Sequence, residues 1–167
     1  MAAPKEPELF SPPRVAVLDS PLGKLWLAAD AGLLTHLSFE ALEGRSGRKE
    51  PVLDEARRQL EQYFRRKRKA FDLPIQRTGT RFKRLVWERI ATVPFGSTTT
   101  YGTIGKAIGG KAIPRTVGRA CGDNPLPIVV PCHRVIAANG LLTGYVGGLW
   151  RKRWLLEHEG ALARELF

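Results

Sequence analysis

Cysteine, histidine and methionine are all scarce in this 167-residue chain, which contains two, three and one of them respectively. Two cysteines cannot build a disulfide framework, so we expect a protein of a reducing compartment rather than a secreted one. So few thiols and imidazoles also leave a structural zinc site short of ligands. The sequence has no apolar run long enough to span a bilayer and no evident secretory signal, so we expect no membrane association through a spanning segment.

Acidic residues are also few: 16 Asp and Glu stand against 27 Lys and Arg, for a formal net charge of +11. An excess of this size favours a polyanionic partner, with nucleic acid ahead of an acidic membrane surface. On charge alone, a basic but otherwise ordinary soluble enzyme is the alternative. Hydrophobic residues make up 43% of the chain, enough for the core of one domain or of two small ones.

The first half of the chain has the pattern of a small sheet followed by a helix. Short β-prone segments at 15–18, 24–29 and 33–39 are separated by turn residues, which predicts a β-meander. Apolar residues then recur at three- and four-residue steps, which predicts a helix over 52–70. This helix would close with the basic run 65–69, which is either a solvated helix end or a contact for phosphates or a targeting receptor.

A domain boundary is expected in the segment 71–79, which contains Pro74 and has no periodic pattern. We therefore divide the chain into domains at 1–75 and 76–167. Beyond the boundary, Thr80 is a candidate cap for a helix with an apolar stripe. The predicted fold class is α+β, with a small β-meander-plus-helix domain followed by a mainly helical domain.

Two short helices joined by a glycine turn follow, at about 101–108 and 114–122, in the outline of a helix-turn-helix. One side of the second helix is apolar and consists of Ile113, Val117, Ala120 and Cys121, so Cys121 is expected to be a small core residue. The other side consists of Arg115, Gly118, Arg119 and Gly122. Arginines can contact phosphates, and glycines let the backbone approach another surface closely. The alternative is a packed helix pair with an exposed polar side.

The second cysteine, Cys132, has an unusual setting between Pro131 and His133. The preceding residues 127–130 predict a short buried extended segment, and Pro131 would fix the direction of the thiol. A thiol becomes a nucleophile as the thiolate, which requires a base or a positive charge nearby. His133 can take the proton, with a bridging water as the favoured route, and Arg134 adds positive charge. This arrangement predicts nucleophilic catalysis.

A base needs an orienting partner, and Glu159 at the end of the last predicted helix is the candidate. It shares a face with Leu155 and Leu156, which would turn its carboxylate toward the core. A buried carboxylate must be paired, and His133 would be a suitable partner. The alternative is a glutamate at a helix end in water.

These residues resemble the O6-alkylguanine-DNA alkyltransferases, also called methylated-DNA–protein-cysteine methyltransferases. The resemblance is carried by Asn124-Pro125, Pro131-Cys132-His133-Arg134-Val135, Gly144-Tyr145, Gly147-Gly148, Lys152, Leu155-Leu156 and Glu159-Gly160. Upstream, Val86-Trp87, Pro94-Phe95-Gly96, Thr100-Tyr101-Gly102 and Pro114-Arg115-Thr116-Val117-Gly118 also fit. The match is specific over about 79–160, whereas only the strand-then-helix outline agrees over the first seventy residues.

The resemblance implies DNA repair by base flipping: alkyl transfer from O6-alkylguanine, and by extension O4-alkylthymine, in duplex DNA to Cys132, once per molecule. It makes His133 the water-mediated base, Glu159 its orienter, Asn124 a hinge and Tyr101 a proton donor to the guanine ring. The DNA-binding residues would be Arg115, which fills the gap left by the flipped nucleotide, with Thr116, Gly118, Arg119 and Gly122. The substrate pocket would include Tyr145, Val146, Val135 and Lys152.

The chain departs from relatives in two places. Val146 replaces the serine of some relatives, so a hydroxyl contact to O6 is lost and a backbone N–H must serve. Relatives with zinc in the first domain use cysteines and histidines that this chain lacks, so no metal and no cofactor are expected. The resemblance also implies a ribonuclease-H-like N-terminal outline and a cytoplasmic protein, nuclear in a eukaryote. We expect a monomer without a membrane partner, and cooperative binding along DNA is left open.

Two other functions would use the same residues. A cysteine hydrolase with a Cys-His-Glu set would need an oxyanion hole and would leave the basic helix face unused. A DNA-binding module without chemistry would leave the stiff Pro131–Cys132 turn unexplained. The fate of an alkylated base and of the Cys132 sulfur separates these hypotheses.

Overall fold

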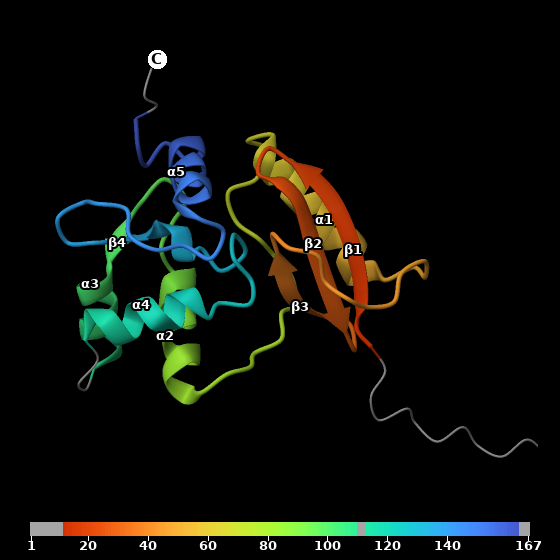
Figure 1. The fold of residues 1–167 in the computed structure, drawn as a ribbon, viewed down its shortest axis with the longest axis horizontal. Coiled ribbons are helices and arrows are strands. Elements are labelled where there is room, and N and C mark those ends of the chain that lie inside the picture. The colour runs from red at the N-terminus through yellow and green to blue at the C-terminus, as the bar shows by residue number, and fades with distance from the viewer. Residues whose placement is uncertain (1–11, 110–112, 164–167) are drawn as a thin grey trace, which may run out of the picture.

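A β-sheet with one helix lies beside a mainly helical part in the computed structural model, which describes residues 12–109 and 113–163 (Figure 1). The strands are β1 (Arg14–Ser20), β2 (Gly23–Asp30) and β3 (Leu33–Ser38), paired antiparallel in the order β1-β2-β3. In the β1–β2 pair, Arg14 lies opposite Ala29 at one end and Ser20 lies opposite Gly23 at the other. The predicted β-meander and the α+β class are therefore confirmed.

Helix α1 (Pro51–Phe64) covers one face of this sheet (Figure 1). Its inward stripe consists of Val52, Leu53, Ala56, Leu60 and Tyr63, all buried. Burial of such a stripe, at about 1.5–3 kcal/mol for each large apolar side chain, is what holds a short amphipathic helix in place. The last residue of the stripe, Tyr63, lies at the end of the helix that faces the C-terminal part of the chain.

The predicted helix over 52–70 is too long, because α1 ends at Phe64. Arg66 has a φ of 61°, and the Lys67 amide donates to the Gln62 carbonyl at 2.8 Å, which is the pattern of a Schellman turn. The basic run 65–69 therefore follows the helix as a surface turn rather than forming its last turn. The positive-φ residue at this stop is an arginine rather than a glycine, so no local residue signal predicts where the helix ends.

The C-terminal part begins with helix α2 (Arg81–Ala91), and the Thr80 hydroxyl caps it by accepting from the Lys83 amide at 3.2 Å. Helices α3 (Tyr101–Ile108) and α4 (Pro114–Gly122) form the predicted pair. Gly109, with a φ of 79°, ends α3, while Gly110 of the predicted turn lies outside the described residues. On α4, Val117, Ala120 and Cys121 are buried as expected. Ile113 is not: it precedes the helix as its N-cap and is 53% exposed.

The extended segment predicted at 127–130 is instead a tight turn. Ile128 has a φ of 73°, and a β-bridge joins Pro127 directly to Val130. The Asn124 side chain holds this turn, because its Oδ1 accepts from the Leu126 amide at 2.9 Å and its Nδ2 donates to the Val130 carbonyl at 2.9 Å. Positive φ costs a β-branched residue energy, and the buried Ile128 side chain and the Asn124 bonds offset that cost.

After the turn, Cys132–Arg134 form a short 3-10 helix, followed by β5 (Val135–Ile136), which pairs in parallel with β4 (Thr99–Thr100). Helix α5 (Leu149–His158) follows and contacts the C-terminal end of α1, with Glu159 as its C-cap and Gly160 at a φ of 76°. Cys132 therefore lies at the start of a 3-10 turn and does not directly follow an extended segment.

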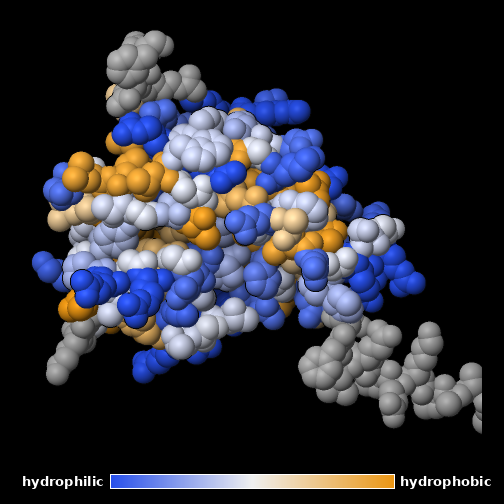
Figure 2. Space-filling model, viewed as in Figure 1, coloured by the Kyte–Doolittle hydropathy of each residue, from blue (hydrophilic) through white to orange (hydrophobic). Residues whose placement is uncertain are grey.

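One hydrophobic core continues through both parts of the chain. On the surface, hydrophilic side chains cover much of the view, with separate apolar patches between them (Figure 2). Among the described residues, no helix is long and apolar enough to cross a membrane. Within the same residues, no three or more His, Cys, Asp or Glu side chains gather as a metal site would require.

Candidate active site and nucleic-acid interface

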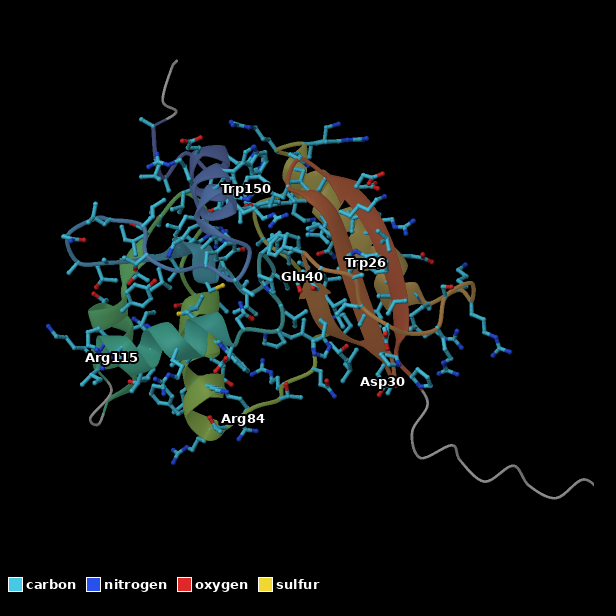
Figure 3. The ribbon with its side chains drawn as sticks, in the orientation of Figure 1. Trp26, Asp30, Glu40, Arg84, Arg115 and Trp150 are labelled. Atoms are coloured by element: carbon cyan, nitrogen blue, oxygen red, sulfur yellow. The ribbon has the colours of Figure 1, made fainter. Side chains whose placement is uncertain are left out.

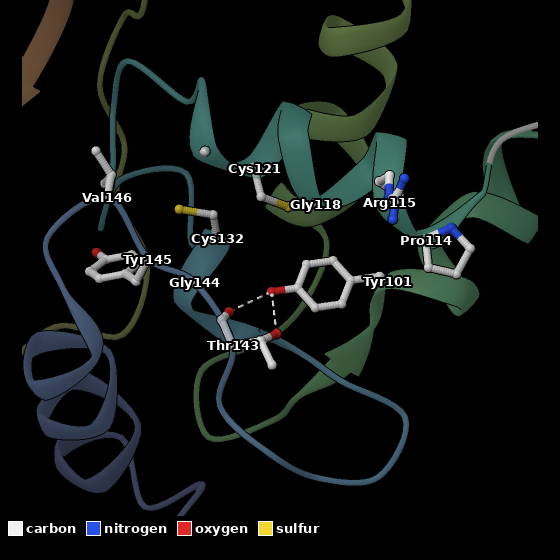
Figure 4. Close-up of a pocket in the computed structure, with 11 residues that line it drawn as sticks. Tyr101, Pro114, Arg115, Gly118, Cys121, Cys132, Thr143, Gly144, Tyr145 and Val146 are labelled. Carbon is white, nitrogen blue, oxygen red and sulfur yellow. Dashed lines mark hydrogen bonds between the residues drawn. The ribbon is translucent and has the colours of Figure 1, made fainter.

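A cavity of about 590 Å³ opens where α3, α4, the 3-10 turn and the loop before α5 meet (Figure 4). It is lined by Tyr101, Pro114, Arg115, Gly118, Cys121, Gly122, Cys132, Thr143, Gly144, Tyr145 and Val146. Of the residues predicted for the pocket, Tyr145 and Val146 line it. Val135 and Lys152 do not: both are buried behind the lining.

Cys132 is 3% exposed, and its Sγ accepts a hydrogen bond from Asn124 Nδ2 at 3.2 Å. Burial raises the pKa of the thiol, and the Asn124 hydrogen bond and the Lys152 charge oppose that rise only in part. The resting side chain is therefore a thiol that lines the cavity, and a base must take its proton before it can act as a nucleophile. Asn124 thus fixes both the turn before Cys132 and the sulfur itself.

His133 and Glu159 form a fully buried pair, with 2.7 Å between His133 Nε2 and Glu159 Oε1. Burial would raise the pKa of Glu159, but hydrogen bonds and charge from His133 and Arg134 outweigh it and lower the pKa to about 2. Burial lowers the pKa of His133, although Glu159 opposes this. A neutral imidazole beside an ionised carboxylate must carry its proton on Nε2. Nδ1 is then a free base, and it has no hydrogen-bond partner among the described residues.

Arg134 has a different role from the one expected. Its Nε donates to Glu159 Oε2 and its Nη2 to Glu159 Oε1, both at 2.9 Å, and its Nη1 donates to the Val93 carbonyl at 2.6 Å. Its charge therefore compensates the buried carboxylate of Glu159 rather than the Cys132 sulfur. Without such a partner a buried carboxylate would cost several kcal/mol.

Sequence reasoning missed one side chain of this centre. Tyr63, on α1, donates from Oη to Glu159 Oε1 at 2.7 Å, from 96 residues away in the chain. No local motif signals such a contact, since it depends on how the helix of the N-terminal part packs against α5. We call Cys132, His133 and Glu159, with their partners Asn124, Arg134 and Tyr63, the Cys132 centre.

Tyr101 lies across the cavity from Tyr145 (Figure 4), and its Oη donates to the Thr143 carbonyl at 2.9 Å. The Lys152 ammonium lies 3.4 Å from the same oxygen, and it also donates to the carbonyls of Val135 at 2.6 Å, Thr143 at 3.1 Å and Gly144 at 3.2 Å. Lys152 thus ties the cavity wall together from behind. Its burial lowers its pKa, and the two cysteines oppose this.

Cys121 is buried as expected, at 8% exposure, but it also lines the cavity (Figure 4). Burial first, and the neighbouring Cys132 second, raise its pKa to about 12. No described side chain donates a hydrogen bond to its sulfur in the way Asn124 does to Cys132. The two thiols of the chain therefore face one cavity with different surroundings.

The outer face of α4 is bare and basic, as predicted. Arg115, Thr116, Arg119 and Gly122 are exposed, and Arg115 projects from the start of the helix (Figure 3). A Cβ on Gly122 would meet no atom within 4 Å, and one on Gly118 would only touch the Tyr101 ring at 3.7 Å. The protein's own packing therefore leaves room for a side chain at both positions.

The fold and the site together define a helix-turn-helix protein whose cavity is lined by a buried cysteine that is followed in the chain by the histidine of a buried His–Glu pair. Family models match both parts of the chain: the DNA-binding domain of 6-O-methylguanine DNA methyltransferase over residues 81–161, and its ribonuclease-like domain over 14–76. The second match agrees with the outline expected for the N-terminal part. The chain therefore belongs to the 6-O-methylguanine DNA methyltransferase family.

Individual relatives agree. A methylated-DNA–protein-cysteine methyltransferase of Methanosarcina acetivorans is 42% identical over 154 residues, covering 87% of this chain and 97% of that protein. The constitutive Bacillus subtilis protein of the same name is 38% identical over 138 residues, covering 77% and 84%. A crystal structure of Mycobacterium tuberculosis OGT in complex with DNA superimposes with a TM-score of 0.81 at 41% identity, covering 89% and 93%.

Proposed function

We propose that this protein repairs duplex DNA by moving the alkyl group of O6-alkylguanine, and also of O4-alkylthymine, onto Cys132 in a single turnover. One observation carries the proposal: the thiol with a His–Glu base behind it opens into the same cavity whose rim is α4 of the helix-turn-helix. Nucleophile and nucleic-acid face are thereby combined in one site. Family membership supports the reaction type.

The first step is removal of the thiol proton. The Nδ1 lone pair of His133 accepts it, directly or through a water, and the Glu159 carboxylate stabilises the resulting imidazolium. The Asn124 hydrogen bond and the nearby Lys152 charge favour the thiolate that remains. The thiol itself stays neutral until substrate arrives, which protects it from other alkylating and oxidising agents.

The second step is displacement at the alkyl carbon. The thiolate forms a C–S bond as the C–O6 bond breaks, and the electron pair passes to the base. Tyr101 protonates the departing base, and the Lys152 ammonium 3.4 Å from its hydroxyl stabilises the phenolate that forms. The products are a restored base and a thioether, which water does not cleave under mild conditions. Each molecule therefore acts once.

The substrate base must leave the duplex to reach the cavity, at a cost of a few kcal/mol. In this proposal α4 lies in the minor groove with Gly118 and Gly122 against the DNA, and Arg115 fills the gap in the base stack. Thr116 and Arg119 contact the backbone. Val146, which is 52% exposed at the cavity edge, offers no hydroxyl to O6, so a backbone N–H of that loop serves instead.

The remaining organisation follows from this function. We propose an N-terminal supporting domain at 1–75 and a DNA-binding and acceptor domain at 76–167. The protein would bind lesion-bearing duplex as a monomer. Titration of the duplex with protein tests whether binding along DNA is cooperative. Two unpaired thiols fit a reducing compartment, the cytoplasm or, in a eukaryote, the nucleus.

The test is a stoichiometric reaction with duplex DNA that contains one O6-methylguanine. The proposal predicts one restored guanine per protein molecule, no further turnover, and a protein that is heavier by one CH₂. Ester hydrolysis without a retained adduct would indicate a hydrolase instead. Binding of the duplex with unchanged protein and unchanged lesion would indicate a DNA-binding module.

A further inference from the structure

The buried hydroxyl of Tyr63 joins the N-terminal part of the chain to the Cys132 centre. Tyr63 has no exposed surface, and its hydroxyl donates a hydrogen bond to Glu159 Oε1 at 2.7 Å. Burial and the negative charge of Glu159 raise the pKa of the phenol well above its ordinary value. The hydroxyl is therefore a permanent donor to the carboxylate.

The surroundings of Tyr63 leave its ring little freedom. His158 Nε2 bonds the Tyr63 backbone carbonyl at 2.8 Å, which ties the end of α1 to the end of α5. The ring also packs on Phe64, Phe71 and Phe95, with centroids 5.3, 5.4 and 6.1 Å away. A hydroxyl held this rigidly fixes the position of the carboxylate oxygen that it contacts.

We propose that Tyr63 is a positioning residue for alkyl transfer, acting through Glu159 to set the orientation and basicity of His133. Glu159 Oε1 is shared by Tyr63 Oη, His133 Nε2 and Arg134 Nη2. Each additional donor reduces the negative potential that Oε1 exerts on the imidazole. Burial is the main cause that keeps His133 neutral, and the Tyr63 donor adds to it, which leaves the Nδ1 lone pair free to accept the thiol proton.

Loss of this donor has a defined electrostatic consequence. The charged groups that act on His133 are Glu159, Arg134 and Lys152. The Tyr145 ring packs edge-on against the imidazole, Cys132 is its neighbour in the chain, and Tyr63 reaches it through the shared Glu159 oxygen. In Tyr63→Phe, the carboxylate acts on His133 without the opposing phenol dipole, so the pKa of His133 rises. The base is then protonated at a higher pH, and its ring is also held less firmly.

The experiment compares single-turnover transfer rates of wild type and Tyr63→Phe across pH, with O6-methylguanine duplex as substrate. We expect the acidic limb of the profile to shift upward by roughly half a unit to one unit. We expect the plateau rate to fall roughly tenfold, the lower end of the loss seen when the hydrogen-bond partner behind a metal-binding histidine is removed. Arg134 still compensates the carboxylate, so the variant folds. An unshifted acidic limb would overturn the proposal.

The matched control is Phe71→Leu, which disturbs packing on the same ring but leaves every donor to Glu159 in place. A purely structural role of Tyr63 predicts that both variants change the profile alike, and that result would also contradict the proposal. ¹⁵N spectra of the His133 ring give a direct second readout: wild type should show the Nε2–H tautomer, and Tyr63→Phe should titrate at a higher pH.

This inference rests on the proposed function, but the two can fail separately. If wild type transfers no alkyl group, the proposed function fails, while the His133 spectra still test the effect of Tyr63. If transfer occurs and both the rate profile and the spectra are unmoved by Tyr63→Phe, only the assignment of Tyr63 fails.

Discussion

The Cys132 centre and the outer face of α4 border one cavity but are built in opposite ways. In the centre, Glu159 accepts hydrogen bonds from three side chains, so its position is fixed from several directions. On α4, Arg115 and Arg119 are exposed and two glycines leave the backbone bare. The chemistry is thus pre-organised within the protein, whereas recognition is left to be completed by the DNA.

The sharpest test of this separation between chemistry and DNA recognition is Cys132→Ala. This variant should lose alkyl transfer and keep its affinity for duplex DNA, because the proposed groove contacts lie on α4. Single-turnover repair and fluorescence anisotropy measure the two properties. Cys121 should not take over as acceptor, since its thiol has a pKa of about 12 and lacks a base behind it. Repair by this variant would show that the nucleophile lies elsewhere.

The next largest effect is expected for Glu159→Gln, which leaves Arg134 and His133 without their carboxylate. Breaking a buried pair of this kind costs about 3–5 kcal/mol in the free energy of unfolding, measured by urea denaturation. Transfer should also fall steeply, because the imidazole loses its orienting acceptor. A variant as stable as wild type at pH 7 would refute the interdependence of the centre.

The pH dependence of stability extends the same test. Folding lowers the pKa of Glu159 from 4.5 to about 2, so its contribution to stability is present above pH 4.5. That contribution, about 3 kcal/mol, is lost as the pH falls from 4.5 toward 2, because protonation removes the charge that the fold stabilises. The stability gap between wild type and Glu159→Gln should therefore narrow over this range.

Arg115→Ala should separate recognition from chemistry. If Arg115 replaces the stacking of the flipped base, its loss slows repair of duplex substrate by roughly 10–100-fold. Reaction with free O6-methylguanine, which needs no extrusion, should change little. Equal losses on both substrates would place Arg115 in the chemistry instead.

Much of this architecture could be predicted from sequence where the signal is local. The Thr80 cap, Pro114 at the start of α4 and Gly160 after α5 each mark a helix boundary by the chemistry of one residue. The end of α1 and the turn at 127–130 were predicted wrongly, because Arg66 and Ile128 adopt positive φ without being glycine. Hydrogen bonds across each turn stabilise these conformations: the Lys67 amide donates to the Gln62 carbonyl in one, and the Asn124 side chain bonds both ends of the other.

The candidate site divides in the same way. Cys132, His133 and Glu159 could be proposed from a short motif and from helix spacing. Tyr63 could not, because its contact with Glu159 spans 96 residues and depends on the packing of α1 against α5. The predicted role of Arg134 was wrong for a related reason. Its position in the sequence suggests a charge close to the Cys132 sulfur, but the 3-10 turn directs its side chain to Glu159. The assigned roles of the site residues remain predictions.

The smallest predicted effect belongs to Arg119, an exposed residue of α4 that would contact a phosphate. Arg119→Gln should weaken duplex binding modestly and reduce the slope of log affinity against log salt by about 1. The chemical step should be unaffected once DNA is saturating. An unchanged slope would remove Arg119 from the DNA interface and confine recognition to the start of the helix.

Peptide mapping after reaction with O6-methylguanine duplex tests the central claim most directly, because both thiols of the chain face the same cavity. The account predicts one added CH₂ on the peptide that contains Cys132, none on the peptide that contains Cys121, and loss of the lesion in equal amount. It is contradicted if the lesion disappears while Cys132 remains unmodified, or if the methyl group is found on Cys121.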